Sequence, residues 1–388
     1  MSTIEKFNEH VMGTYGRYPL VLEKGEGRSA FDEDGKSYID FGSGIGTNSL
    51  GYCDDDWAEA VCKQARLVQH TSNYYYTKIQ ADFADKLSEV TGYEKMFFGN
   101  SGAEANECAI KIARKYSFDK YGKDSKRYNI ITLTNSFHGR TLTTLSATGQ
   151  EVFHNYFLPF TEGFLNAETN NIADLMNKID DTVCAVMIEF VQGEGGVNPL
   201  DRSFVDELFR ICAERDILVI ADEVQTGAGR TGTFLASEQY GVKPNVTTLA
   251  KGVAGGVPIG VCLADEKCGN VLTKGTHGST FGGNPLACAG GLAVATKVSS
   301  EGFLDDVKAK GEYFRKKLAE IPDVEGVDGL GLMLGIRLKG KSAAEVCGRC
   351  FENGLLVLTA KDKLRLLPPL NITYDEIDTG IEILRRSL

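Results

Sequence analysis

Two residues at predicted strand ends could carry chemistry. Lys251 follows the β-branched run at residues 246–249, and Asp222 ends the apolar run at residues 217–221. Open α/β sheets bind ligands at the carboxyl ends of their strands, so Lys251 is a candidate reactive lysine, although on position alone a solvated loop lysine is the commoner case. The carboxylate of Asp222 could bind a metal, accept from a ribose, pair with a protonated ring nitrogen, or simply cap a helix.

A glycine-containing segment at residues 99–106 lies between a predicted strand and a long amphipathic helix. The first amides of a helix bind an anion, because they point outward at the favourable end of the helix dipole. Ser101 and Glu104 also have the spacing of a capping box, which would satisfy the same amides. A phosphate and a cap can share such a site, so the segment remains a candidate for phosphate binding.

A third segment, residues 135–141, again directly follows a predicted strand. Phe137 could stack on a planar cofactor and Arg140 could bind a carboxylate, although a loop phenylalanine is more often a packing residue. An imine-forming lysine, a carboxylate for a ring nitrogen, a helix start for a phosphate and an aromatic for stacking are the groups that pyridoxal 5′-phosphate requires. No other common cofactor needs all four.

Two other motifs compete with this interpretation. Gly227–Gly232 matches the dinucleotide pattern G-x-G-x-x-G, but no Asp or Glu occurs between Gln239 and Ala264, where a ribose ligand is expected, and no long helix opens at Gly232. This argues against a nicotinamide-dependent dehydrogenase. Cys347 and Cys350 have metal-like spacing, but no second pair or histidine follows them, and residues 343–353 predict a helix, so a zinc site is disfavoured.

Composition excludes several classes of protein. The chain has 388 residues, 42 Lys plus Arg and 53 Asp plus Glu, for a formal net charge of −11. This charge argues against a dedicated binder of nucleic acid or of anionic membranes. The start of the chain is polar, no apolar run approaches the roughly 20 residues of a membrane span, and the 10 cysteines are scattered. We therefore expect a cytoplasmic protein with reduced thiols and no metal site.

The elements that must position these residues alternate along the chain. Short apolar runs predict strands at residues 95–99, 129–135, 183–189, 217–222, 247–250 and 260–264, and helical patterns such as 103–120 and 203–215 lie between them. This alternation predicts an α/β protein with a mostly parallel sheet covered by helices on both faces. After residue 285 two helices, short strands and a closing helix predict a smaller α+β domain.

With these residues and motifs, the sequence resembles the class III aminotransferases of pyridoxal-phosphate fold type I, most closely the acetylornithine aminotransferase group. The similarity runs from residues 14–17 to residues 364–369. It is carried by five segments in order, residues 100–106, 137–141, 221–232, 249–252 and 277–285. The resemblance implies a large domain with a mostly parallel seven-stranded sheet plus a smaller α+β domain. We expect residues 1–50 to serve the small domain and the substrate site, residues 51–285 to bind the cofactor, and residues 286–388 to form the small domain.

The resemblance also implies roles in cofactor binding. Lys251 would bind pyridoxal 5′-phosphate covalently and act as the base, and Asp222 would pair with the ring nitrogen. The other cofactor-binding positions would be Gln225 at the ring hydroxyl, Val224 and Phe137 on the two ring faces, Ser101, Gly102 and Ala103 at the phosphate, and Thr280 at the phosphate of a neighbouring subunit. A homodimer with shared active sites is therefore expected.

For substrates, the resemblance implies an amino donor and 2-oxoglutarate as acceptor. Arg140, Ser279 and Tyr15 match donor-binding positions, while Arg365 would take the α-carboxylate of 2-oxoglutarate and Glu194 would be its switchable ion-pair partner. The expected reaction moves the δ-amino group of N2-acetylornithine to 2-oxoglutarate, giving N-acetylglutamate 5-semialdehyde and glutamate, as in arginine biosynthesis. Succinylornithine, ornithine and 4-aminobutyrate remain alternative donors, and an aminomutase or a decarboxylase remains an alternative activity.

Overall fold

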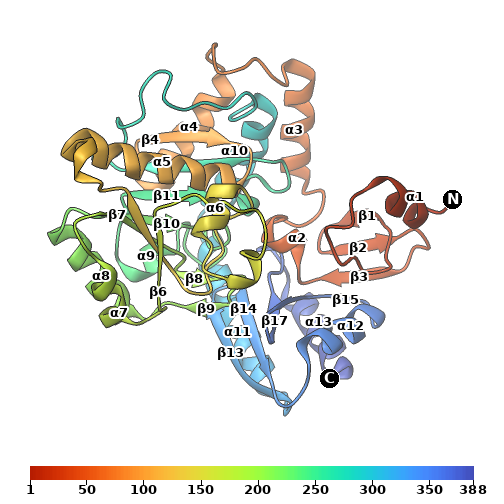
Figure 1. The fold of residues 1–388 in the computed structure, drawn as a ribbon. Helices are drawn as coiled ribbons and strands as arrows, with labels where there is room; N and C mark the ends of the chain where they lie inside the picture. Colours follow the sequence, from red (N-terminus) through yellow and green to blue (C-terminus); the bar gives the residue numbers. More distant parts are fainter.

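A seven-stranded sheet forms the centre of the computed structural model, which describes residues 1–388 (Figure 1). In order across the sheet the strands are β4 (Lys95–Gly99), β12 (Gly260–Ala264), β11 (Val246–Leu249), β10 (Leu218–Asp222), β7 (Val183–Ile188), β5 (Asn129–Leu133) and β6 (Phe164–Ala167). Only β12 runs against its neighbours, since it pairs antiparallel with both β11 and β4. The predicted mostly parallel sheet is confirmed.

Six of these strands lie where the apolar runs predicted them, and β6 was not among the predicted runs. This edge strand is the short segment Phe-Leu-Asn-Ala, only its last residue is buried, and it pairs with β5 alone. A half-exposed edge strand needs no continuous apolar run, which is why its sequence gave no clear signal.

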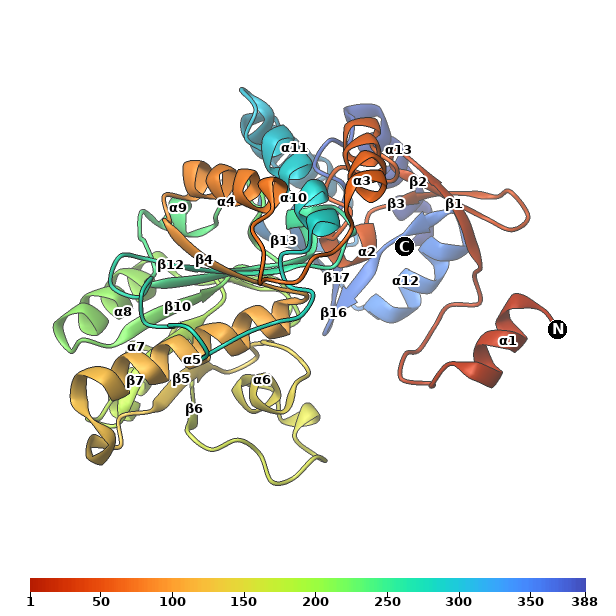
Figure 2. The same cartoon turned by 90° about the horizontal axis from the view of Figure 1, so that it is seen from above.

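Helices cover both faces of the sheet, as Figure 2 shows from above. The helix α5 (Gly102–Tyr121) packs on one face through small side chains such as Cys108, Ala109 and Ala113, against Ile130 and Met187 of the strands. The opposite face is covered by α4 (Lys78–Thr91), α7 (Ile172–Lys178), α8 (Arg202–Glu214) and α10 (Pro285–Val298). With both faces buried, the charged side chains near the site lie at the ends of these strands, while threonines such as Thr132 and Thr247 are buried within them.

The C-terminal part forms a second, smaller layer of strands and helices, shown in blue in Figure 1. Its antiparallel sheet has the order β13 (Val324–Leu330), β14 (Met333–Leu338), β17 (Lys363–Leu366) and β16 (Leu358–Ala360). Its helices are α11 (Phe303–Ala319), α12 (Ala343–Glu352) and α13 (Tyr374–Ser387). Together with the large sheet this confirms the predicted α/β fold with a smaller α+β part.

The N-terminal strands join this smaller part. A four-stranded sheet has the order β1 (Leu22–Glu26), β2 (Ser29–Asp32), β3 (Ser37–Asp40) and β15 (Leu355–Leu356), so β3 pairs with a strand from the C-terminal part. The helix α10 packs instead against α4 and against α3 (Asp55–Leu67), beside the large sheet. The division of the chain at residues 50 and 285 stays a prediction.

The remaining elements are short. They are α1 (Thr3–His10), α2 (Ser43–Gly46), α6 (Leu142–Ala147), α9 (Ser237–Tyr240), β8 (Val191–Gln192), β9 (Asn198–Pro199) and the 3₁₀ turns at Lys123–Ser125, Glu151–Phe153 and Lys251–Ala254. The helix α1 lies apart from the body of the chain, with no buried residue (Figure 2). None of the helices combines the length and the apolar character needed to cross a membrane.

Candidate active site

The carboxyl ends of β10 and β11 open into a cavity of about 410 Å³. Asp222 is the last residue of β10, and Lys251 follows β11 after a single alanine. The cavity wall also contains residues from the starts and ends of several other elements, namely Ser101, Gly102, Ala103, Asn106, Phe137, His138, Arg140, Glu189, Glu194, Val224 and Gln225. The sheet thus brings the two predicted residues to one edge, as its topology requires.

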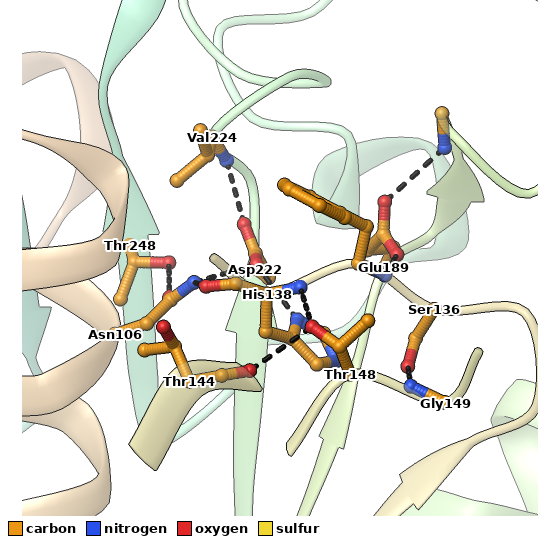
Figure 3. A network of polar contacts seen from close by, with 12 residues as sticks. Asn106, Ser136, His138, Thr144, Thr148, Gly149, Glu189, Asp222, Val224 and Thr248 are labelled. Atoms are coloured by element: carbon orange, nitrogen blue, oxygen red, sulfur yellow. Dashed lines mark hydrogen bonds and ion pairs between the residues drawn. The ribbon is translucent and has the colours of Figure 1, made fainter. Parts of the chain in front are cut away.

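The carboxylate of Asp222 is buried, 4% exposed, and receives three hydrogen bonds (Figure 3). Asn106 Nδ2 and His138 Nδ1 both donate to Oδ2 at 2.8 Å, while the amide of Val224 donates to Oδ1 at 3.1 Å. Asn106 is itself fixed, because Thr248 Oγ1 donates to its Oδ1 at 2.7 Å. Donors on both oxygens satisfy this buried carboxylate and fix its orientation at the cavity wall.

The lysine at the cavity is partly buried among mostly polar residues of the cavity wall. Burial lowers the pKa of Lys251, although Glu194 and Asp222 oppose this effect through their negative charge. Its backbone has φ 46°, in the left-handed region that non-glycine residues rarely adopt. A lowered pKa makes the neutral amine more accessible, and the neutral amine is the form that attacks a carbonyl or removes a proton.

The start of α5 forms the third predicted feature. Ser101 caps the helix by accepting from the amide of Glu104 at 3.2 Å, but the predicted capping box is only half present. The carboxylate of Glu104 accepts instead from the backbone and the side chain of Asn100, both at 2.8 Å. The amides of Gly102 and Ala103 therefore have no partner within the chain and remain available to an anion.

Close packing at this helix start explains one glycine. A Cβ atom on Gly102 would lie 2.7 Å from Cγ1 of Val224, another residue of the cavity wall.

Phe137 also borders the cavity, and the exposed side chain of Arg140 lies 5.4 Å from its ring centre and 4.1 Å from that of Phe153. Arg140 has no carboxylate partner.

An ion pair closes the side of the cavity next to the smaller layer. Arg365 of β17 donates from Nη1 to Glu194 Oε1 at 2.6 Å and to Gln225 Oε1 at 3.3 Å. Burial alone would raise the pKa of Glu194, but Arg365, with a smaller effect from Lys251, outweighs it and lowers that pKa. The pair is therefore charged, and Gln225 contacts it by accepting from Arg365.

Four predicted residues are not part of the cavity wall. Arg365 adjoins it through Glu194 and Gln225, and the other three lie outside it. Thr280 is exposed, and Ser279 Oγ accepts from Asn100 Nδ2 at 3.1 Å and from the amide of Gly282 at 3.0 Å. Tyr15 is 74% exposed in the N-terminal segment. The fold of one chain does not bring these three residues to Lys251, so their roles stay predictions.

Sequence reasoning missed His138, Asn106 and Glu189 as site residues. His138 and Asn106 lie within two segments that had been singled out, but nothing in their spacing shows that they meet Asp222 from 84 and 116 residues away. Glu189 directly follows β7, as Asp222 ends β10, so the position of an acidic residue at a strand end was the available signal.

The two competing motifs, the Gly227–Gly232 loop and the cysteines of α12, make packing contacts within the chain. In the Gly227–Gly232 loop the buried Arg230 donates to the backbone oxygens of Leu332 and Pro368, so this loop binds the smaller layer. Cys347 is buried on α12, where its thiol lies 3.0 Å from the hydroxyl of Tyr18 and donates to the backbone of Val357.

Comparison with known proteins agrees with this geometry. The family model "Aminotransferase class-III" matches residues 12–388. An acetylornithine aminotransferase of Haemophilus ducreyi is 49% identical over 98% of this chain and 96% of its own length. The crystal structure of N-acetylornithine aminotransferase from Stenotrophomonas maltophilia has a TM-score of 0.86 at 34% identity, covering 99% of this chain and 98% of that one. An ornithine aminotransferase from Toxoplasma gondii has a TM-score of 0.94 at 31% identity, covering 99% and 93%.

With its whole length matched and its lysine, carboxylate and helix start on one cavity, the chain belongs to the class III aminotransferases, which are enzymes that use pyridoxal 5′-phosphate. The residues present fit this cofactor. The helix start has two amides without partners for the phosphate, Asp222 offers a buried anion to a ring cation, and the amine of Lys251 has no hydrogen-bond partner.

The buried Glu223, next to Asp222, predicts how stability depends on pH. Its carboxylate accepts from the amides of Ala236 and Ser237, and burial raises its pKa to about 7. Between its ordinary value near 4.5 and about 7, the folded protein keeps a proton that the unfolded chain has released. This group therefore lowers the free energy of unfolding as pH rises, by up to about 1.4 kcal/mol per pH unit.

We expect Glu223→Gln to make that loss shallower when the apoenzyme is unfolded in denaturant at pH 5 to 8. Glu94→Gln, at an exposed position, is the matched control and should leave the slope unchanged. Equal slopes in wild type and Glu223→Gln would contradict the assignment.

Proposed function

We propose that the chain transfers the δ-amino group of N2-acetylornithine to 2-oxoglutarate, giving N-acetylglutamate 5-semialdehyde and glutamate. The observation that carries this proposal is the pair of arginines around one lysine. Arg140 has no carboxylate partner at the cavity, whereas Arg365 is paired with Glu194. One arginine is thus open to the carboxylate of a donor and the other is reserved. The names of the relatives support the same donor.

Each residue near the cavity then has a physical task. Pyridoxal 5′-phosphate supplies an electron sink for the carbanion formed when the substrate loses a proton. Asp222 holds a positive charge on the ring nitrogen, and Phe137 and Val224 keep the ring plane fixed. Lys251 would hold the cofactor and, once the donor has taken its place, would move the proton, since its lowered pKa favours the neutral amine that acts as a base.

The ion pair gives one site two specificities. While Glu194 covers Arg365, a donor that places a neutral chain near this pair meets no free charge. When Glu194 moves away, the guanidinium can bind the α-carboxylate of 2-oxoglutarate with two parallel hydrogen bonds. Arg140 binds the distal carboxylate of the donor, which disfavours a simple diamine.

We also propose a homodimer in which Thr280 and Ser279 act on the partner's cofactor and donor, with Tyr15 as a further donor contact. An exposed apolar surface supports this: Tyr75 is 72% exposed and Phe281 is 59% exposed. The two segments lie together, because Asn73 Nδ2 donates to the backbone of Ser279 at 3.1 Å. Such patches mark protein interfaces.

The ten free cysteines, eight of them buried, support a reducing compartment such as the cytoplasm.

Specificity constants test the choice of donor. With 2-oxoglutarate as acceptor, acetylornithine should exceed succinylornithine, ornithine and 4-aminobutyrate. Arg140→Gln should lower kcat/KM for acetylornithine by about 10- to 150-fold, the effect of a lost hydrogen bond to a charged group, and leave putrescine, which has no carboxylate, almost unchanged. An enzyme that prefers ornithine, or an equal effect of Arg140→Gln on putrescine, would contradict the proposal.

Lys251→Ala should lower turnover by at least about 100-fold, because it removes both the covalent attachment and the base. Borohydride reduction followed by mass spectrometry should fix the cofactor on the wild type and not on this variant. Lys243→Ala, at an exposed lysine that donates to the backbone of Gly92, is the control. Significant turnover by Lys251→Ala would refute the assigned role.

Hybrid dimers test the shared site. Thr280→Val alone should weaken cofactor binding, and Lys251→Ala alone should be inactive. In a mixed dimer one site carries both changes and the other carries neither, so random mixing should restore about a quarter of wild-type activity. No recovery in a mixture whose sedimentation shows dimers would contradict the contribution of Thr280 across the interface.

A further inference from the structure

Glu189 is a buried acidic residue in the cavity wall to which the reaction above gives no task. It directly follows β7, which lies in the middle of the sheet between β10 and β5. Its side chain is buried, with the residue 6% exposed, and it shares the cavity with Lys251. A buried carboxylate without a cationic partner is costly, so its contacts need a reason.

The two oxygens of Glu189 bind two different loops. Oε1 accepts from the amide of Phe137 at 2.9 Å, and Oε2 accepts from the amide of Gly193 at 3.1 Å (Figure 3). The first loop, residues 135–141, carries the aromatic ring at the cavity. The second loop, residues 190–196, carries Glu194, the partner of Arg365.

We propose that Glu189 is a positioning residue that holds the aromatic ring of Phe137 and the ion pair of Glu194 at one fixed spacing by binding both loops with a single carboxylate. A carboxylate offers an acceptor oxygen to each amide. A glutamine side chain at this position would have only one oxygen. Its NH2 group would then face the second backbone N–H, and two donors cannot bind each other. This inference rests on the proposed function for the role of the ion pair, but not for the role of the ring.

The chain offers a matched control at Gln192. Its Nε2 donates to the backbone oxygen of Thr134, the residue directly before the first loop, at 2.8 Å, so it also connects the two segments. Gln192 is buried, 1% exposed, but it does not border the cavity. Gln192→Leu therefore loosens the same loops without touching the carboxylate, and it reports what a merely structural change does.

The experiment uses Glu189→Gln, Glu189→Asp and Gln192→Leu, each with two measurements. One is the dissociation constant of pyridoxal 5′-phosphate from the apoenzyme, by titration. The other is the KM for 2-oxoglutarate, separated from kcat. Both Glu189 variants should raise the dissociation constant and the KM by about 10-fold or more, because each variant reaches one amide instead of two. Gln192→Leu should change neither by more than about 2-fold.

Double-mutant cycles then test the two connections separately. The effect of Glu189→Gln on cofactor binding should shrink when Phe137→Leu is present, and its effect on the KM should shrink when Glu194→Gln is present. Three outcomes would overturn the proposal. The effects of the paired substitutions could simply add in both cycles, Glu189→Asp could have the dissociation constant and KM of the wild type, or Gln192→Leu could change them as much as Glu189→Gln does. The titration uses no substrate, so a wrong amino donor would leave this part of the result intact.

Discussion

The constraint on which the site depends is a buried carboxylate that lacks a permanent cationic partner. Asp222 is 4% exposed, and its only charged-type contact within the chain is His138. Nδ1 of His138, Nδ2 of Asn106 and the amide of Val224 orient the carboxylate, and no Lys or Arg side chain forms an ion pair with it. The carboxylate therefore stays available to a cationic group in the cavity, as the proposed binding of the cofactor ring requires.

The surroundings of Asp222 follow from this need for rigidity. Its donors come from α5, from the loop after β5 and from its own turn, so three elements must hold their places to keep one carboxylate oriented. The same elements carry the helix start and the ring of Phe137. The geometry of the site therefore depends on sheet packing, since a shift of α5 on the sheet would move both Asn106 and the free amides of Gly102 and Ala103.

The positions of Asp222 and Lys251 could be predicted because they depend on local sequence patterns. Apolar runs end at Asp222 and before Lys251, and strand ends meet at one edge of a parallel sheet. Other contacts are not local: Glu189 binds the amide of Phe137, 52 residues earlier in the chain, as well as that of Gly193, 4 residues later, and no periodicity encodes the first pairing. The half-formed capping box at Glu104 shows the same limit, because spacing alone cannot decide between two nearby amides.

The two members of the ion pair at the edge of the cavity differ in burial. The side chain of Arg365 is 4% exposed on a strand flanked by β14 and β16, whereas that of Glu194 is 31% exposed. The backbone beside Glu194 is held, because the amide of Gly193 donates to Glu189. In the proposed reaction the pair would therefore open by rotation of the Glu194 side chain, which would expose Arg365 to the second substrate without moving the loop.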